Sequence, residues 1–283
     1  MKRKPAEEED DVETKDQQTD DEDEDDQEII DVDFDFFDPK ETDFHGLKTL
    51  AKQTFSNDAD EFDLSGIADG IIAQPYLGSV VKADGAADPY AIMTVLGMSP
   101  DPKTGKLASH MQTIKDYILK KSSKSNDATH HEKLSTILSK HAVGLLVNER
   151  LINMPPQIVV PMLKMLIEEL QWSIEENKLA KPFEYLLLIS KTYVEVEPTT
   201  DEDGDAGPSK KKKRKGKQVV LNFQIEDEVF EKHAEFQFDF QFSNQNDHAE
   251  LLQTAGIKTS RRIYVLKASK LQTIHDAMKE FIQ

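Results

Sequence analysis

Residues 29–55 read I-I-D-V-D-F-D-F-F-D-P-K-E-T-D-F-H-G-L-K-T-L-A-K-Q-T-F, and the spacing of their apolar residues changes once. In the first part, apolar side chains alternate with Asp31, Asp33 and Asp35. A period of two predicts a strand with one apolar face and one row of carboxylates. Pro39 ends this strand, because proline has no N–H for a ladder hydrogen bond.

An amphipathic helix is expected next, over residues 44–55. Thr42 or Asp43 offers an N-cap, and apolar residues follow at helical spacing. The segment therefore predicts a strand, a turn and a helix. Its acidic face has two readings: the solvated side of an ordinary unit, or a docking edge for a basic partner.

Most of the negative charge lies at the start of the chain. The whole sequence carries 54 acidic and 35 basic residues, a net charge of −19. Residues 1–38 hold nineteen acidic and four basic residues, so residues 39–283 carry a net charge of only −4. We expect a disordered acidic tail over residues 1–28 and a single folded domain over residues 29–283.

The tail has two readings as well. It is a solubilising segment, or it holds Lys/Arg-rich protein surfaces by charge. The second reading makes acidic residues of the tail and of the first strand candidate client-binding residues. They are Asp20, Asp21, Glu22, Asp23, Asp31, Asp33 and Asp35.

Composition excludes several classes of site. The chain has no cysteine, which rules out disulfides and thiolate chemistry and suits a reducing compartment. No secretory signal is read at the start, and no apolar run approaches the ~20 residues of a membrane helix. A soluble intracellular protein is expected.

The rest of the chain alternates between helix and strand patterns. Helices are predicted over residues 62–73 with a cap at Ser65, and over 111–121, 134–141, 155–176, 247–255 and 271–282. The helix over 155–176 is expected to bury a stripe of apolar residues that includes Ile167 and Ile174. Trp172 beside that stripe and Phe281 in the last helix are also expected in the core. Strands are predicted over residues 76–81, 90–98, 143–152, 183–196, 219–225, 229–242 and 262–266.

Two of these strands are expected to be long antiparallel neighbours. Residues 183–196 begin as a continuous apolar run, which is typical of a strand covered on both faces. Residues 236–242 read F-Q-F-D-F-Q-F. A disordered loop over residues 197–217 would join the two strands, and loops of this length are usually functional or disordered.

That loop contains the most specific short motif in the chain. Six consecutive cations follow Gly207-Pro208, namely Lys210, Lys211, Lys212, Lys213, Arg214 and Lys215. Such a block stays solvated and extended, the form that a nuclear import receptor reads. A purely solubilising loop and phosphate contact with RNA are the alternatives.

Catalytic and nucleotide motifs are missing or incomplete. The loop over residues 99–107 lacks the spacing of a phosphate loop, and Leu107 stands where Ser or Thr would hold magnesium. His130-His131-Glu132 is the single histidine cluster, placed in a polar linker, and no HExxH or G-x-S-x-G occurs. No catalytic, cofactor-binding or metal-binding residue is assigned.

Several separated segments resemble one known family. They are D-V-D-F-D-F-F-D-P at residues 31–39, D-F-H-G-L-K-T-L at 43–50, D-L-S-G-I-A-D-G-I-I at 63–72, and the strand pair that ends in F-Q-F-D-F. They resemble the BCCIP family, named for binding a breast-cancer susceptibility protein and a cyclin-kinase inhibitor. The likeness covers nearly the whole chain after residue 28, and the acidic tail and Lys-rich loop are similar to those of fungal members.

The resemblance implies an α/β (α+β) fold similar to the GCN5-related acetyltransferases (GNAT): a mixed, largely antiparallel sheet flanked by helices. That fold binds acetyl-CoA through an R/Q-x-x-G-x-G/A loop. Here the loop after Met98 reads S-P-D-P-K-T-G-K, which lacks the pattern, so the fold is expected without the activity.

The resemblance also implies a non-enzymatic nuclear chaperone and transport adaptor that shuttles to the cytoplasm. The implied partners are a basic ribosomal protein of the large subunit, a phosphatidylinositol phosphate kinase that is exported from the nucleus, and a nuclear import receptor. No membrane and no direct nucleic-acid contact are expected. Two other functions stay open: an acyl-CoA-dependent N-acetyltransferase with a divergent loop, and a histone chaperone that uses the same acidic tail.

Overall fold

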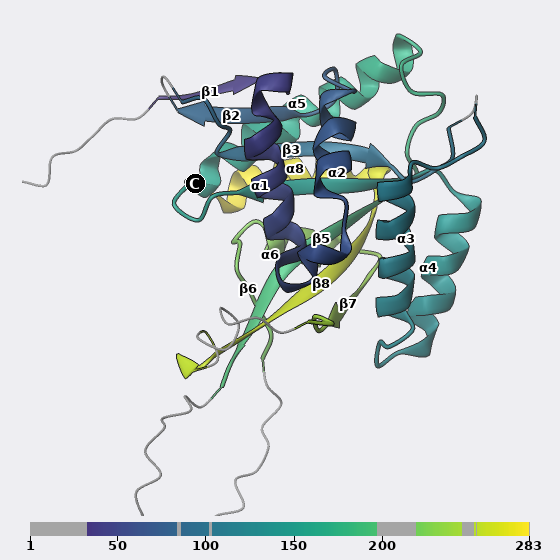
Figure 1. Ribbon diagram of the computed structural model, residues 1–283, viewed down its shortest axis with the longest axis vertical. Coiled ribbons are helices and arrows are strands. Elements are labelled where there is room, and N and C mark those ends of the chain that lie inside the picture. The colour runs from purple at the N-terminus through teal and green to yellow at the C-terminus, as the bar shows by residue number, and fades with distance from the viewer. Residues whose placement is uncertain are drawn as a thin grey trace, which may run out of the picture. The chain divides into compact units, whose positions relative to one another are not determined.

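One mixed sheet organises the part of the chain that the structure, a computed structural model, describes (Figure 1). The described residues are 33–83, 86–101, 104–196, 219–244, 252 and 254–282. The chain divides into Met1–Val32 and Asp33–Gln283, and every described residue belongs to the second unit.

Eight strands of the described chain form this sheet in the order β1-β2-β3-β4-β5-β8-β7, with β6 beside β5. Only β4 and β5 are parallel; all other neighbouring pairs are antiparallel. The strands are β1 (Phe34–Phe37), β2 (Ser79–Ala83), β3 (Ala91–Gly97), β4 (Val143–Arg150), β5 (Tyr185–Glu195), β6 (Leu221–Asn222), β7 (Phe236–Phe240) and β8 (Ile257–Lys267). The expected mixed, largely antiparallel sheet is confirmed.

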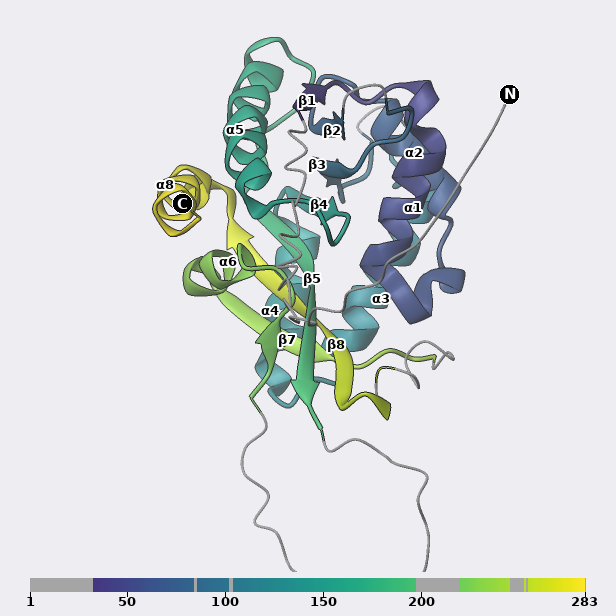
Figure 2. The same cartoon turned by 90° about the vertical axis from the view of Figure 1, so that its left-hand side faces the viewer.

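Helices cover both faces of the sheet (Figure 2). One face packs against α1 (Phe44–Phe55), α2 (Leu64–Ile72), α3 (Ser109–Ser122) and α4 (Ala128–Lys140). The other packs against α5 (Val159–Glu175), α6 (Asp227–His233) and α8 (Leu271–Phe281). Short 3-10 turns lie at η1 (Glu41–Asp43), η2 (Ser56–Glu61), η3 (Pro156–Ile158) and η4 (Ala268–Lys270).

The strand β5 confirms the prediction of a centre strand covered on both sides. Leu187 and Ile189 belong to the core under α1–α4, whereas Leu186 and Leu188 belong to the core under α5 and α8. A strand buried on both faces needs apolar residues at successive positions, which explains the unbroken run in the sequence.

The opening unit folds as its spacing predicts. Phe34 and Phe36 are half-buried, Asp33 and Asp35 are exposed, and α1 follows after η1. Asp43 precedes α1 but does not cap it: its carboxylate accepts a hydrogen bond from the Lys40 amide at 2.9 Å and pairs with Lys82.

The cap predicted for the second helix is wrong by two residues. Asp63, not Ser65, is the N-cap of α2, and its carboxylate accepts the Gly66 amide at 2.8 Å. The helix approaches His110 closely, because a Cβ at Gly66 or Gly70 would lie 3.0 or 3.2 Å from the His110 ring. The two glycines therefore serve packing.

The predicted strand over residues 229–242 is also wrong in its first half. Residues 227–233 form α6, because Val229 and Phe230 turn together into the core beneath α8. The expected long pairing with β5 does not occur. The strand β8, predicted over residues 262–266 alone, spans eleven residues and pairs with β5 from Tyr185↔Lys267 to Glu195↔Ile257.

Two smaller expectations change. His130-His131-Glu132 belongs to the first turns of α4 instead of a linker; the His130 ring stacks on Phe236 at 5.4 Å. Phe281 is exposed instead of inward and lies under the Lys232 ammonium group. The predicted tail over 1–28 and loop over 197–217 lie outside the described residues, as do residues 247–251 and 253 of the predicted helix over 247–255.

Candidate protein-binding surfaces

The predicted acidic docking edge is partly described. The strand β1 pairs with β2 and has no other neighbour in the described sheet, so one of its edges is open. Asp33 and Asp35 are exposed there. Lys82 lies opposite Asp35 but directs its ammonium group to the Asp43 carboxylate and the Ala87 carbonyl, so it does not neutralise Asp35.

The other predicted binding residues cannot be placed. Asp31 and the tail residues Asp20, Asp21, Glu22 and Asp23 lie outside the described residues. The same holds for the basic block of Lys210, Lys211, Lys212, Lys213, Arg214 and Lys215. Their assigned roles stay predictions.

The strands β4 and β5 separate after a short paired stretch, and charged side chains bridge the gap between them. The two strands pair over four positions only, from Val143↔Tyr185 to Leu146↔Leu188. Beyond them, Lys191 of β5 donates to the Glu149 carboxylate of β4, and Arg150 pairs with Glu226 at 2.9 Å. Ion pairs replace the backbone ladder where the strands diverge.

A buried serine–aspartate pair lies beside this gap. Ser190 donates a hydrogen bond to Asp227 Oδ2, while Asp227 Oδ1 and Asn148 Nδ2 have no partner among the described residues. Burial, followed by the charge of neighbouring Glu226, raises the pKa of Asp227 well above its ordinary value. Both residues are buried, which keeps a substrate away from the pair.

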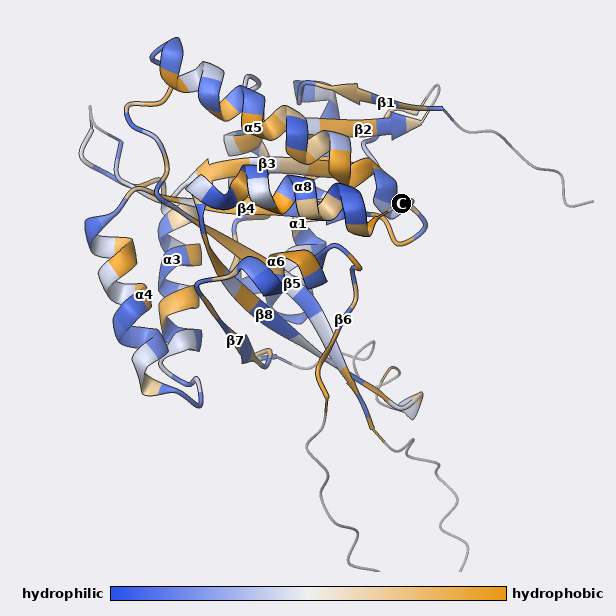
Figure 3. Ribbon diagram, turned by 180° about the vertical axis from the view of Figure 1, so that it is seen from behind, coloured by the Kyte–Doolittle hydropathy of each residue, from blue (hydrophilic) through white to orange (hydrophobic). Residues whose placement is uncertain are grey.

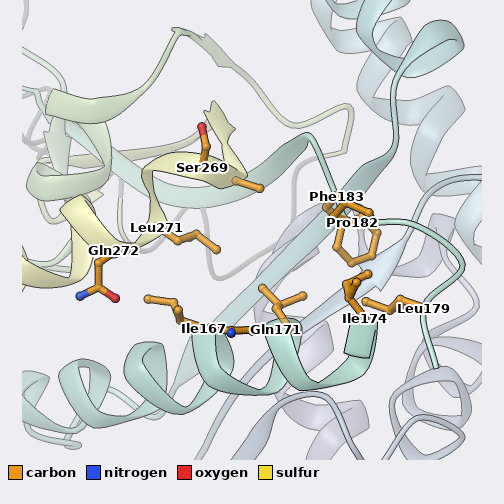
Figure 4. A pocket seen from close by; sticks show the side chains of 11 residues that line it. Ile167, Gln171, Ile174, Leu179, Pro182, Phe183, Ser269, Leu271 and Gln272 are labelled. Atoms are coloured by element: carbon orange, nitrogen blue, oxygen red, sulfur yellow. The ribbon is translucent and has the colours of Figure 1, made fainter. Parts of the chain in front are cut away.

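An apolar cavity of 430 Å³ opens between α5 and α8 (Figure 4). Its lining carries no charged side chain; Gln171, Ser269 and Gln272 supply the polar atoms. It explains why Ile167 and Ile174, both predicted in the buried stripe of α5, are only half-buried. Trp172, also expected in the core, is exposed beside Tyr76, with ring centroids 6.5 Å apart.

A second apolar surface was missed by the sequence reading. Alternate residues of V-V-L-N-F-Q-I at 219–225 expose their side chains, namely Val219, Leu221, Phe223 and Ile225, here called the apolar stripe. Their period of two was the available signal and predicted a strand. Large apolar residues at that spacing are normally assigned to the core, so the pattern did not reveal that this face is open.

The described residues contain neither a metal site nor a membrane-spanning helix. No group of three His, Cys, Asp or Glu side chains there is arranged to bind a metal ion. None of the helices in this part is both long and apolar enough to cross a lipid bilayer.

Comparisons with known proteins agree on one family. The BCCIP family model matches residues 29–230. Protein bcp1 of Aspergillus oryzae is 39% identical over 263 residues, which cover 90% of this chain and 89% of that protein. Protein bcp1 of Schizosaccharomyces pombe is 40% identical over 246 residues, covering 84% of this chain and 86% of that protein.

A solved structure has the same fold. The crystal structure of BCP1 from Saccharomyces cerevisiae aligns with a TM-score of 0.58 at 24% identity, covering 92% of this chain and 93% of that one. The likeness thus extends over both halves of the sheet and the helices on each face. Because the family model matches most of the chain and the relatives from Aspergillus oryzae and Schizosaccharomyces pombe are similar over most of their length, this chain is a member of the BCCIP family.

Proposed function

We propose that the chain is a non-enzymatic nuclear chaperone and transport adaptor that binds a basic ribosomal protein of the large subunit before ribosome assembly. Membership of the BCCIP family is the observation that carries the proposal, because it supports a chaperone-type role without catalysis in general terms. The basic ribosomal client is the finer part of the proposal.

The charge of the chain supports a basic client. A net charge of −19 attracts Lys/Arg-rich proteins over a distance and speeds their capture. Exposed Asp33 and Asp35 on the open edge of β1 extend this charge onto the folded domain. Apolar contacts must then supply most of the affinity, because exposed charges contribute little once screened by salt.

The proposal includes transport. Lys210 to Lys215 would bring the protein into the nucleus through an import receptor, and the protein would then support nuclear export of a phosphatidylinositol phosphate kinase while shuttling to the cytoplasm. The kinase partner rests on the family resemblance alone. The basic block rests on its sequence.

A fold like that of an acetyltransferase does not require the acetyltransferase activity. We propose that the fold is similar to that of the GCN5-related acetyltransferases. An acyl-CoA-dependent activity is the alternative function, and the loop after β3 argues against it, because S-P-D-P-K-T-G-K lacks the glycine pattern that cradles the pyrophosphate.

The test is capture from nuclear extract with three baits: the full chain, the chain without residues 1–28, and a chain whose tail keeps its length but has Ser and Asn for every Asp and Glu. We expect mass spectrometry to find a basic large-subunit ribosomal protein on the full chain. Both altered baits should capture less of it, and capture should weaken with added salt.

Three results would redirect the assignment. Histones in place of ribosomal proteins favour the histone chaperone. Measurable heat with micromolar acetyl-CoA in calorimetry favours the transferase. Capture of no basic protein at low ionic strength rejects the chaperone proposal.

A further inference from the structure

The apolar stripe concentrates exposed hydrophobic surface in seven residues. Val219 is 70% exposed, Leu221 36%, Phe223 43% and Ile225 46%, and these are four of the eight large hydrophobic residues exposed in the described chain. Figure 3 shows the segment around β6 in hydrophobic colours. Contiguous exposed apolar residues of this kind usually mark an interaction surface.

The residues between them hold the stripe in place. Asn222 accepts a hydrogen bond from the Tyr264 hydroxyl at 3.0 Å and donates one to Glu231 at 3.1 Å. Gln224 is buried, and buried Glu226 pairs with Arg150. Because the even-numbered side chains are anchored, the odd-numbered ones are held outward.

The backbone of β6 has an open edge. The Phe223 amide donates to the Lys191 carbonyl of β5 at 3.0 Å. Successive residues of an antiparallel pair point their backbone groups alternately toward and away from the partner, so the N–H and C=O of Asn222 point away from β5. In the described sheet β6 pairs with β5 alone, and β4 has left that side of β5 beyond Leu146.

An open edge beside an apolar stripe fits an added strand. The backbone of such a strand would complete the ladder, and its alternate side chains would lie on Leu221 and Phe223 beside Tyr193, whose ring is 4.8 Å from that of Phe223. We propose that β6 binds an extended segment of a basic protein by strand addition, with apolar residues of that segment on the apolar stripe.

Charge selects a basic partner over a second copy of this chain. Two copies, each with a net charge of −19, repel one another. Exposed Glu195 at the end of β5 and exposed Glu228 in α6 lie on the two elements next to β6. An extended segment that alternates apolar residues with Lys or Arg would satisfy both the stripe and these carboxylates. This inference rests on the proposed function, which supplies the basic client.

The probe is a labelled ten-residue peptide that alternates valine with lysine, measured by fluorescence anisotropy against the full chain. A peptide with the same ten residues arranged in pairs cannot place its valines on one strand face. A third peptide carries N-methyl groups on the edge that would pair with β6. We expect the alternating peptide to bind at least ~10-fold more tightly than either control, equivalent to about 1.4 kcal/mol.

Variants locate the site. The triple variant Leu221→Thr, Phe223→Thr, Ile225→Thr keeps strand propensity but removes apolar surface, and should weaken the alternating peptide at least ~10-fold. Ile152→Thr is the matched control, because Ile152 is 91% exposed and is not part of the apolar stripe, so its loss should leave peptide binding unchanged. The comparison with the N-methylated peptide uses the unaltered chain, so it tests strand addition even if the triple variant unfolds.

Several outcomes overturn the site. Equal binding of the three peptides excludes strand addition. Light scattering that shows a dimer, abolished by the triple variant, assigns the stripe to a second copy. If the alternating peptide binds the stripe only after residues 197–217 are deleted, the chain's own loop is the segment that binds the stripe.

Failure of this site and failure of the proposed function are distinguishable. If the triple variant captures the basic ribosomal protein from extract as well as the unaltered chain does, the strand-addition site is wrong and the proposed function stands. If the alternating peptide binds at the stripe but no basic ribosomal protein is captured, the site stands and the proposed client is wrong.

Discussion

Two buried aspartates show how the same side chain meets opposite environments. Asp58 accepts hydrogen bonds from Tyr117, Lys121 and the Ser243 and Asn244 amides. Burial would raise its pKa, but these donors, the two amides foremost, hold the pKa of Asp58 below its ordinary value. Asp227 receives one hydrogen bond and lies beside Glu226, so its pKa is raised.

Replacing each by asparagine should therefore change stability in opposite directions at pH 7. Asp58→Asn weakens a charged network and should lower the free energy of unfolding by about 3–5 kcal/mol. Asp227→Asn removes the cost of ionising a buried carboxyl and should leave stability equal or higher. Urea unfolding followed by fluorescence of Trp172 measures both.

The pH dependence of the two variants provides the control. A carboxyl whose pKa is lowered by folding stabilises the folded state at pH values above its unfolded pKa of about 4. That contribution is lost as the pH falls below this value. A carboxyl whose pKa is raised by folding stabilises the folded state at pH values below about 4. That contribution is lost as the pH rises through the pKa of the carboxyl in the folded protein. The Asp227→Asn difference should thus shrink as pH falls toward 4, whereas the Asp58→Asn difference should shrink only below pH 4. Destabilisation by Asp227→Asn at pH 7 that persists at pH 4 would contradict a raised pKa of Asp227.

At the scale of elements, a glycine pair tests the packing of β3 on β4. Gly97 and Gly144 are opposite one another. A Cβ at Gly144 would lie 2.3 Å from Val95 Cγ1 and 3.1 Å from Leu186 Cδ2, whereas a Cβ at Gly97 meets nothing closer than Phe183 at 4.0 Å.

Gly144→Ala should lower the free energy of unfolding by about 1–3 kcal/mol through overpacking. Gly97→Ala should raise it by about 0.5–1 kcal/mol, because alanine loses less backbone entropy than glycine. Thermal unfolding of the two variants measures both. Equal effects from the two substitutions would mean that the strands are not packed as described.

Sequence spacing predicted the elements that depend on their own residues. The helices α1, α3, α5 and α8 follow from apolar residues at helical period, and β5 from its unbroken apolar run. Strand partners depend on distant residues, and here prediction was wrong: β8 occupies the place beside β5 that was assigned to residues 229–242. For the same reason the exposed stripe beside β6 was not predicted, since exposure depends on β4 leaving β5.

At the scale of the whole molecule, charge is divided between an acidic start and one basic block. The candidate acidic residues were read from composition and alternation, and Asp33 and Asp35 are indeed exposed. The block at Lys210 to Lys215 should determine the compartment, because an extended run of cations is what an import receptor binds.

Changing Lys211, Lys212 and Arg214 to alanine should therefore leave a fluorescent fusion in the cytoplasm. The matched control changes three lysines elsewhere, Lys120, Lys124 and Lys140, to alanine with the same loss of charge. Microscopy of living cells reads the result. A nuclear signal that survives in the first variant would show that another segment directs import.

The pairing of β5 with β8 also governs how this chain is made. The paired residues are separated by roughly sixty to eighty positions in the sequence, so β5 leaves the translating ribosome well before its long partner exists. During that interval its unbroken apolar run is uncovered, and the acidic residues synthesised first travel with it as a built-in solubiliser. A protein proposed to guard others against aggregation thus needs the same protection for its own central strand at birth.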